Sequence, residues 1–334
     1  MTERMRSDAQ AFLDCLYDEQ RRAASYPFTD AERFCWQYTP GRRNGLSLAD
    51  MEPNQRERAM GLVDAGLSAS GAETARGIIA LEPVLRSLEE AQGRADFERR
   101  DPARYWFSVF GDPASAEAWG WRLGGHHLCL HFTEVDEDVA VTPLFFGANP
   151  AQVPDGPQRG MRLLAAEEDL ARALVRGLDD EQRATAVVSA EAPADILTRN
   201  AVRPEIAAAP TGIGYTTLRP DQQRLMGDLL EVYLGRVRER PPVSPERLTF
   251  AWAGSTEPGQ GHLLRPARRA LPGRVRQHPE RREPRAHGVA RLAPRLGRGP
   301  ARRALPSRAR LLTARGGGVI HAPASPGSGS GFRT

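Results

Sequence analysis

The stretch WGWRLGGHHLCLHFTEVDEDVAVTPLFF, residues 119–146, is the part of the chain that decides the fold class. Its aromatic and β-branched residues predict one long strand over residues 119–135. The acidic residues 136–138 predict a polar turn, and residues 139–146 predict a returning strand that contains Pro143. This region is therefore expected to form an antiparallel hairpin.

Helices are predicted on both sides of this hairpin, because apolar residues recur there every three or four positions. The predicted helices cover residues 7–24, 54–66, 71–91, 160–178 and 220–237. Further short strands are predicted at residues 105–110, 185–189 and 247–253. This order predicts an α+β fold with N-terminal helices packed on a mainly antiparallel sheet, in a single domain over residues 1–262.

The cysteine content and the apolar runs narrow the class of protein. Three cysteines do not make an even disulfide framework, so a reducing compartment is expected. We find neither a signal-peptide pattern at the N-terminus nor an apolar run long enough to cross a membrane. A cytoplasmic location without a membrane partner is therefore expected.

The positive charge of the chain is confined to its last quarter. Residues 262–334 contain 17 of the 46 basic residues, all of them arginine, and two of the 42 acidic residues. Residues 1–261 therefore hold 29 basic and 40 acidic residues, so the predicted domain is acidic. An acidic body argues against nucleic acid as its partner.

Several phrases of the sequence occur in an order that is typical of one protein family. They are WGWRLGGHHLCLHFT, VTPLFFGANPA, MRLLAAEEDLARAL, VVSAEAPADIL and LTFAWAGSTEPGQGH. Together they resemble the domain-of-unknown-function family number 3500 over residues 8–262. The resemblance implies a shared fold, but it implies no reaction, because that family has no assigned activity.

The tail departs from the family pattern in a way that a change of reading frame explains. Codons can be chosen for residues 273–291 that, read one base out of frame, encode the family strand VEYDNTQNGANHVHTVWRD, and codons for residues 300–305 can encode LLAEHY in the same way. We therefore interpret residues 263–334 as an out-of-frame translation that is disordered and leaves the domain incomplete. The alternative is a genuine disordered tail, rich in arginine and proline, that binds nucleic acid or anionic surfaces.

Two adjacent histidines and a cysteine are the candidate site residues. Histidine titrates near neutrality, so His126 and His127 are the candidate catalytic residues. In a strand, His127 and Cys129 would share one face at a spacing of about 6.5 Å, which makes them candidate metal ligands. His126 would point to the opposite face.

Two ligands do not complete a metal site. The family strand that the resemblance implies carries His-x-His, and those two codons are read here as Pro284 and Ala286, so such a site would be broken in this chain. The resemblance also implies that residues 125–128 recur in the family, whereas Cys129 and His131 are particular to this chain. The alternatives are a core histidine with satisfied hydrogen bonds and a ligand contact without chemistry.

Other polar and aromatic residues give weaker indications. Four aromatic residues are candidates for a small-molecule pocket, with core packing as the alternative: Trp36, Tyr38, Trp119 and Trp121. The acidic residues 167–169 are expected either on a solvated helix face or as partners of a helix N-terminal dipole, and Asp195 with Arg199 in a loop salt bridge. The glycine-rich stretches match neither a phosphate-binding loop nor a nucleophile elbow.

Two functional hypotheses remain. The first is an enzyme that depends on a metal or on histidine and whose site is broken in this chain. The intact family would then hold a divalent metal, and this chain would hold none. The second is a non-catalytic domain that binds an unidentified small molecule or has a structural role.

Overall fold

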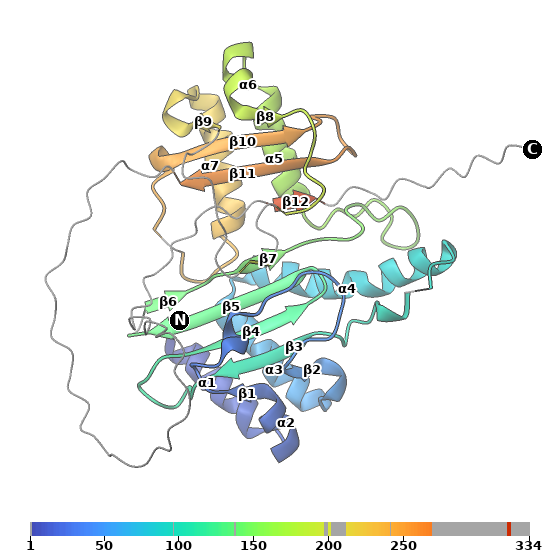
Figure 1. Ribbon diagram of the computed structural model, residues 1–334, viewed down its shortest axis with the longest axis vertical. Helices are drawn as coiled ribbons and strands as arrows, with labels where there is room; N and C mark the ends of the chain where they lie inside the picture. The colour runs from blue at the N-terminus through green and yellow to red at the C-terminus, as the bar shows by residue number, and fades with distance from the viewer. Residues whose placement is uncertain are drawn as a thin grey trace, which may run out of the picture.

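The computed structural model contains two sheets, each with its own helices (Figure 1). It describes residues 2–95, 97–136, 138–196, 200–201, 212–240, 242–268 and 319–321. Helices and strands are both present in each part, which confirms the α+β prediction.

The first sheet has the strand order β1–β3–β4–β5–β6, with β2 paired to β3 and β7 paired to β5. Its strands are β1 Ser25–Tyr26, β2 Leu46–Ser47, β3 Trp106–Phe110, β4 Trp119–Gly125, β5 Leu128–Val135, β6 Asp138–Ala140 and β7 Leu144–Phe146. Both β6 and β7 return antiparallel to β5, as the sequence predicted. They are two strands rather than one, and Pro143 lies in the interruption.

The prediction of one strand over residues 119–135 is wrong. The chain turns at His126–His127, so β4 and β5 form a hairpin in which Gly125 pairs with Leu128 and Trp119 pairs with Glu134. Glycine is needed at position 125, because a Cβ there would lie 2.1 Å from Cδ1 of Tyr105. The turn therefore places both histidines at one end of the sheet.

Four helices pack on the first sheet. They are α1 Thr2–Asp14, α2 Asp18–Ala24, α3 Pro53–Gly66 and α4 Ala69–Ala91, so the predicted helix 7–24 is in fact two helices. Apolar residues of α1, α3 and α4 meet β3, β4 and β5 in the first hydrophobic core. The packing is close, since a Cβ on Gly66 of α3 would lie 2.6 Å from the ring of Phe132.

The second sheet has the order β12–β11–β10–β8, with β9 paired to β10. Its strands are β8 Val187–Ser189, β9 Ile213–Gly214, β10 Leu248–Gly254, β11 His262–Arg268 and β12 Val319–His321. The helices α5 Ala165–Arg176, α6 Asp180–Ala186 and α7 Pro220–Leu234 accompany it. Their apolar residues form a second core with β10, separate from the first. A third, smaller cluster of Leu81, Ala148, Val153 and Leu164 lies apart from both.

The remaining short elements are single turns of 3-10 helix. They are η1 Ala31–Phe34, η2 Leu48–Asp50, η3 Phe97–Arg99, η4 Tyr215–Thr217 and η5 Pro245–Arg247. The side chain of Asp30 accepts a hydrogen bond from the backbone N–H of Glu32 and so caps the start of η1.

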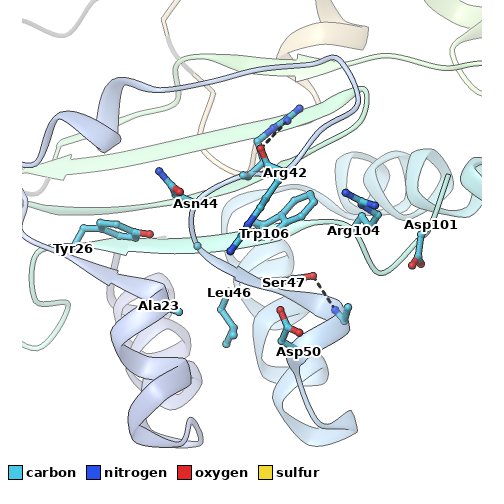
Figure 2. A pocket seen from close by; sticks show the side chains of 13 residues that line it. Ala23, Tyr26, Arg42, Asn44, Leu46, Ser47, Asp50, Asp101, Arg104 and Trp106 are labelled. Atoms are coloured by element: carbon cyan, nitrogen blue, oxygen red, sulfur yellow. Dashed lines mark hydrogen bonds between the residues drawn. The ribbon is translucent and has the colours of Figure 1, made fainter. Parts of the chain in front are cut away.

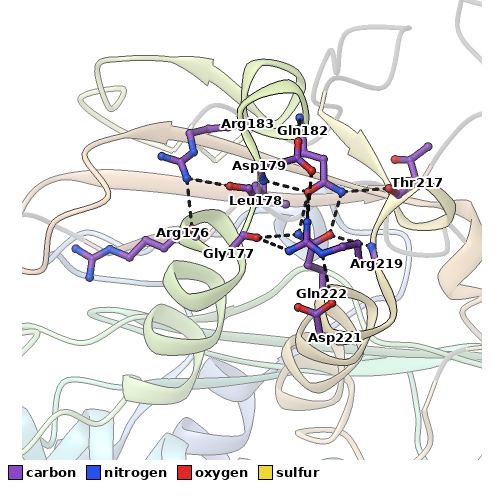
Figure 3. A network of polar contacts seen from close by, with 10 residues as sticks. All are labelled: Arg176, Gly177, Leu178, Asp179, Gln182, Arg183, Thr217, Arg219, Asp221 and Gln222. Carbon is purple, nitrogen blue, oxygen red and sulfur yellow. Dashed lines mark hydrogen bonds and ion pairs between the residues drawn. The ribbon is translucent and has the colours of Figure 1, made fainter.

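Polar side chains join the helices that accompany the second sheet, at the point where α5 ends and α6 and α7 begin (Figure 3). The amides of Gln182 and Gln222 donate to one another over 3.0 and 2.8 Å, and Gln222 also donates to the carbonyl of Gly177 over 2.8 Å. Asp179 accepts from the backbone N–H of Gln182. Since these groups satisfy each other, the network holds the helices together.

Two sets of contacts join the first sheet and its helices to the second sheet and its helices. The backbone carbonyl of Arg236, just after α7, accepts from the N–H of Ser68 at the start of α4. The Arg236 guanidinium contacts the carboxylate of Glu167 on α5 and lies 4.6 Å from the ring centroid of Phe146 in β7. The second set is a hydrogen bond of 2.8 Å from the Tyr38 hydroxyl to the carboxylate of Asp195.

The tail boundary predicted at His262 falls on the first residue of β11. Leu263 and Leu264 are buried, and both belong to β11, the strand that pairs with β10. The described backbone therefore extends past the predicted boundary, to Arg268, and β12 pairs with β11. The rest of the predicted tail lies outside the described residues.

No helix in the described part of the chain has the length and apolar character needed to cross a membrane.

Candidate functional site

The histidine turn, residues 126 and 127, is held by backbone contacts on both sides. The N–H of His127 donates to the carbonyl of Tyr38 over 2.8 Å, and the N–H of Gly147 donates to the carbonyl of His127 over 2.7 Å. His127 has a positive φ of 55°, a conformation uncommon for a residue with a side chain. The turn brings the two imidazole centroids within 4.1 Å of each other.

His126 is buried between a carboxylate and a guanidinium. Its Nδ1 lies 2.5 Å from Oε1 of Glu82 on α4, and its Nε2 lies 3.4 Å from Nη1 of Arg100. Arg100 also donates two hydrogen bonds of 2.8 Å to the carboxylate of Glu89. A guanidinium can only donate, so Nε2 of His126 accepts, and the imidazole proton lies on Nδ1 and points at Glu82.

Burial sets the charge state of this pair. It raises the pKa of Glu82 to about 7, and burial together with Arg100 lowers the pKa of His126 to about 3. Above pH 7, neutral His126 therefore donates to ionised Glu82, and at lower pH the pair takes up one shared proton. Tyr105 donates to the carbonyl of His126 over 2.9 Å, and burial raises its pKa well above the usual value, so it stays a donor.

His127 faces a set of aromatic rings on the side of the sheet away from the first core. We call Trp36, Tyr38 and Phe145 the aromatic cluster. Its ring centroids are 5.1 to 6.3 Å apart, and the Phe145 ring meets His127 edge-on at 6.4 Å. All three rings are half-buried, so part of each surface is open to a ligand.

The imidazole of His127 has an enclosed nitrogen without a partner. Its Nδ1 is buried and has no hydrogen-bond partner among the described residues, and the residue as a whole is half-buried. Burial lowers the pKa of His127 well below its usual value, so the ring is neutral near pH 7. Gly147 packs against this ring, where a Cβ would lie 3.2 Å from Cβ of His127.

The family model described as "Protein of unknown function (DUF3500)" matches residues 1–266. This chain belongs to the DUF3500 family. The match includes the histidine turn, Glu82, Arg100 and the aromatic cluster, and it ends close to the predicted tail boundary. No curated protein and no solved structure matches the chain.

The DUF3500 structure does not bring together the aromatic residues that the sequence predicted in one pocket. Trp119 and Trp121 are fully buried on the helix side of the first sheet, where Trp119 donates to Glu134 and Trp121 stacks on Phe132 at 4.6 Å. Trp36 lies in the aromatic cluster on the other side. Core packing therefore accounts for Trp119 and Trp121, because both fill the space under α1 and α3.

The predicted ligand pair His127 and Cys129 is separated by the turn. His127 lies at the sheet end, whereas Cys129 is buried within β5, where burial raises the pKa of its thiol to about 11. Among the described residues, no three histidine, cysteine or acidic side chains form a group that could hold a metal ion. The positions that the family strand would supply, Pro284 and Ala286, lie outside the described residues.

The weaker candidates are placed as follows in the DUF3500 fold. Of the acidic residues 167–169, only Asp169 is exposed; Glu167 is buried against Arg236, and Glu168 pairs with Arg172 at 2.7 Å, so these two do not form a solvated face. Both lie in the first turn of α5, in agreement with the expected interaction with the helix dipole. Asp195 accepts from Tyr38, and Arg199 lies outside the described residues.

Sequence reasoning missed Glu82, Glu89, Arg100 and Phe145 as site residues. A signal for the two glutamates was present in the helix over residues 71–91. Glu82 and Glu89 continue the apolar stripe of Ile78 and Leu85 at helical spacing, so they had to lie on its buried face. The sequence carried no comparable signal for Arg100, which lies in a loop.

Proposed function

We propose that the histidine turn and the aromatic cluster form a small-molecule site, in which His127 meets a polar group of the ligand. The observation that supports it best is a neutral, half-buried imidazole that has no hydrogen-bond partner among the described residues and stands beside three half-buried aromatic rings. Natural small-molecule sites combine mostly apolar walls with few polar groups in this way. The ligand is therefore an aromatic or otherwise flat compound with a hydroxyl or amine.

The proposed role of His126 is to position its neighbour. The hydrogen bonds to Glu82 and Arg100 fix the His126 ring, and the His127 ring lies against it at 4.1 Å. A neutral imidazole can accept a hydrogen bond from a bound hydroxyl, and general-base catalysis is the reaction step that a histidine allows here, although its lowered pKa makes His127 a weak base. His127 is the proposed proton acceptor.

Phenol and toluene are suitable probes, because they have similar shape and only phenol carries a hydroxyl. We expect phenol to shift the NMR signals of His127 and Trp36 and to bind roughly fivefold more tightly than toluene, as one net hydrogen bond allows. His127→Phe should abolish this preference, whereas Phe145→Ala should weaken both compounds alike. Equal binding of the two compounds to the unaltered protein would refute the proposal.

The second candidate function is binding without chemistry. It is supported by the same geometry and differs only in outcome, since a binding domain would leave a bound phenolic compound unchanged. We propose following phenyl acetate by NMR with the full chain: consumption that His127→Phe abolishes supports an enzyme, and unchanged ester with retained phenol binding supports the binding domain.

The metal site, the shifted reading frame and the cytoplasmic location remain proposals from the sequence. We propose to sequence the gene around codon 262, repair the frame and measure bound metal in both versions. Stoichiometric metal in the repaired protein alone, lost in His127→Ala, would support a site completed by the family strand. An intact frame in independent reads would reject the shifted tail.

A further inference from the structure

A second pocket lies beside the histidine turn, where β2 pairs with β3 (Figure 2). Its volume is about 590 Å³. It is close to the turn because Trp106, in its wall, pairs with Gly124 of β4. Neither histidine lines it, so its function goes beyond the proposed one. Its charged and aromatic lining includes Arg42, Arg43, Asp50, Asp101, Arg104 and Trp106.

The pocket is electropositive in an acidic part of the chain. Three arginines line it against two aspartates, although acidic residues outnumber basic ones 40 to 29 over residues 1–261. Asp101 accepts from the backbone N–H of Ala103 over 2.8 Å, so part of its carboxylate is used locally. A concave surface with excess positive charge concentrates anions.

Two of the arginines have unused donors. The side chains of Arg42 and Arg104 make no hydrogen bond or ion pair with any part of the chain that the structure describes. The Arg104 guanidinium carbon lies 6.0 Å from the centroid of the Trp106 ring, which is also part of the pocket lining. Figure 2 shows that Arg42 comes from the loop before β2 and Arg104 from the segment before β3.

The third arginine fixes the loop that carries Arg42. Arg43 donates to the carbonyls of Gly41, over 3.0 Å, and of Thr39, and its Nε is enclosed without a partner among the described residues. Gly45 of the same loop has a φ of 119°, and a Cβ added at this position would lie 2.6 Å from the carbonyl oxygen of Phe107. The pocket wall is therefore held before a ligand arrives.

We propose that this pocket binds a phosphorylated polyol. Arg42 and Arg104 supply planar, charged donors that suit the oxygens of a phosphate group. Asp50 and the free oxygen of Asp101 accept from hydroxyl groups, which a bare inorganic anion lacks. The combination of arginine and aspartate in one pocket selects an oxyanion that is attached to hydroxyl-bearing carbon.

Calorimetry on the full chain with glucose 6-phosphate, glucose and inorganic phosphate tests this proposal. We expect glucose 6-phosphate to bind more tightly than either of the other two, and its affinity to fall as salt is added. Arg42→Gln and Arg104→Gln should each weaken it roughly tenfold, as the loss of one charge-assisted hydrogen bond predicts. Arg58→Gln, at an exposed position of α3 outside the pocket, is the matched control.

Three results would overturn the assignment. They are no binding of glucose 6-phosphate at millimolar concentration, equal binding of glucose, and equal loss of affinity in Arg58→Gln and Arg42→Gln. Arg42 is exposed, so its variant is expected to fold, and its thermal unfolding confirms this independently. Loss of phenol binding at His127 would leave these results unaffected, because the two sites share no lining residue.

Discussion

Replacing Glu82 by glutamine and His126 by asparagine should change the pH dependence of stability in opposite directions. The pKa of Glu82 rises from 4.5 to about 7 on folding, so between these values the folded state binds its proton more tightly. The contribution of Glu82 to the free energy of unfolding therefore falls as the pH rises through this window.

His126 contributes with the opposite sign. Its pKa falls from 6.5 to about 3 on folding, so the unfolded state binds the proton more tightly in that window, and the contribution of His126 rises with pH. From pH 4.5 to 6.5 the two contributions cancel, which makes the unaltered protein insensitive to this pair. Each single substitution removes one contribution and exposes the other.

The expected size of these effects follows from the binding of one proton, which changes the free energy of unfolding by at most about 1.4 kcal/mol per pH unit. As the pH rises from 5 to 6.5, the free energy of unfolding of Glu82→Gln should rise by roughly 2 kcal/mol relative to that of the parent. The free energy of unfolding of His126→Asn should fall by a similar amount relative to the parent. Among the other groups facing the pair, the lowered pKa of Glu89 and the raised pKa of Tyr105 place their titrations outside this window. The pKa of His127 is lowered like that of His126, so it adds the same slope to the parent and to each variant and drops out of the comparison.

Urea denaturation followed by tryptophan fluorescence at four pH values measures these slopes. Glu90→Gln, on an exposed position of the same helix, is the control and should leave the slope unchanged. The double variant should return to the parent slope. Slopes that depart from the parent slope in the same direction in the two single variants would refute the assignment of opposite pKa shifts to the pair.

Three further outcomes are expected from the structure. Gly147→Ala should lower phenol affinity several-fold with little loss of stability, measured by NMR titration and thermal unfolding, because the added methyl group displaces the His127 ring by a few tenths of an ångström. Arg236→Met should lower the free energy of unfolding by about 3 kcal/mol or more, since it leaves the buried Glu167 carboxylate unpaired, and urea denaturation checks this. Cys35 should react with a thiol reagent in the folded protein and Cys129 only after unfolding; equal rates would contradict the burial of Cys129.

The α+β class and most helices could be predicted because they depend on local periodicity. The stripe of Ile78, Leu81 and Leu85 repeats at helical spacing, and α4 forms there. The hairpin at residues 126–127 could also have been found. The core-facing apolar residues are odd-numbered up to Leu123 and even-numbered from Leu128 onward, and such a change of phase requires a turn or a bulge between them.

The sequence alone determined the elements, the two histidines and the acidic character of the body, because composition and short-range spacing are properties of neighbours along the chain. Only the tertiary structure decided that Glu82 meets His126 across 44 positions, that Phe145 of the aromatic cluster meets His127, and that Trp119 and Trp121 lie in the core instead. These contacts depend on the path of the backbone between distant segments. The same path sets the burial that shifts the pKa of Glu82 and His126, and no local pattern records it.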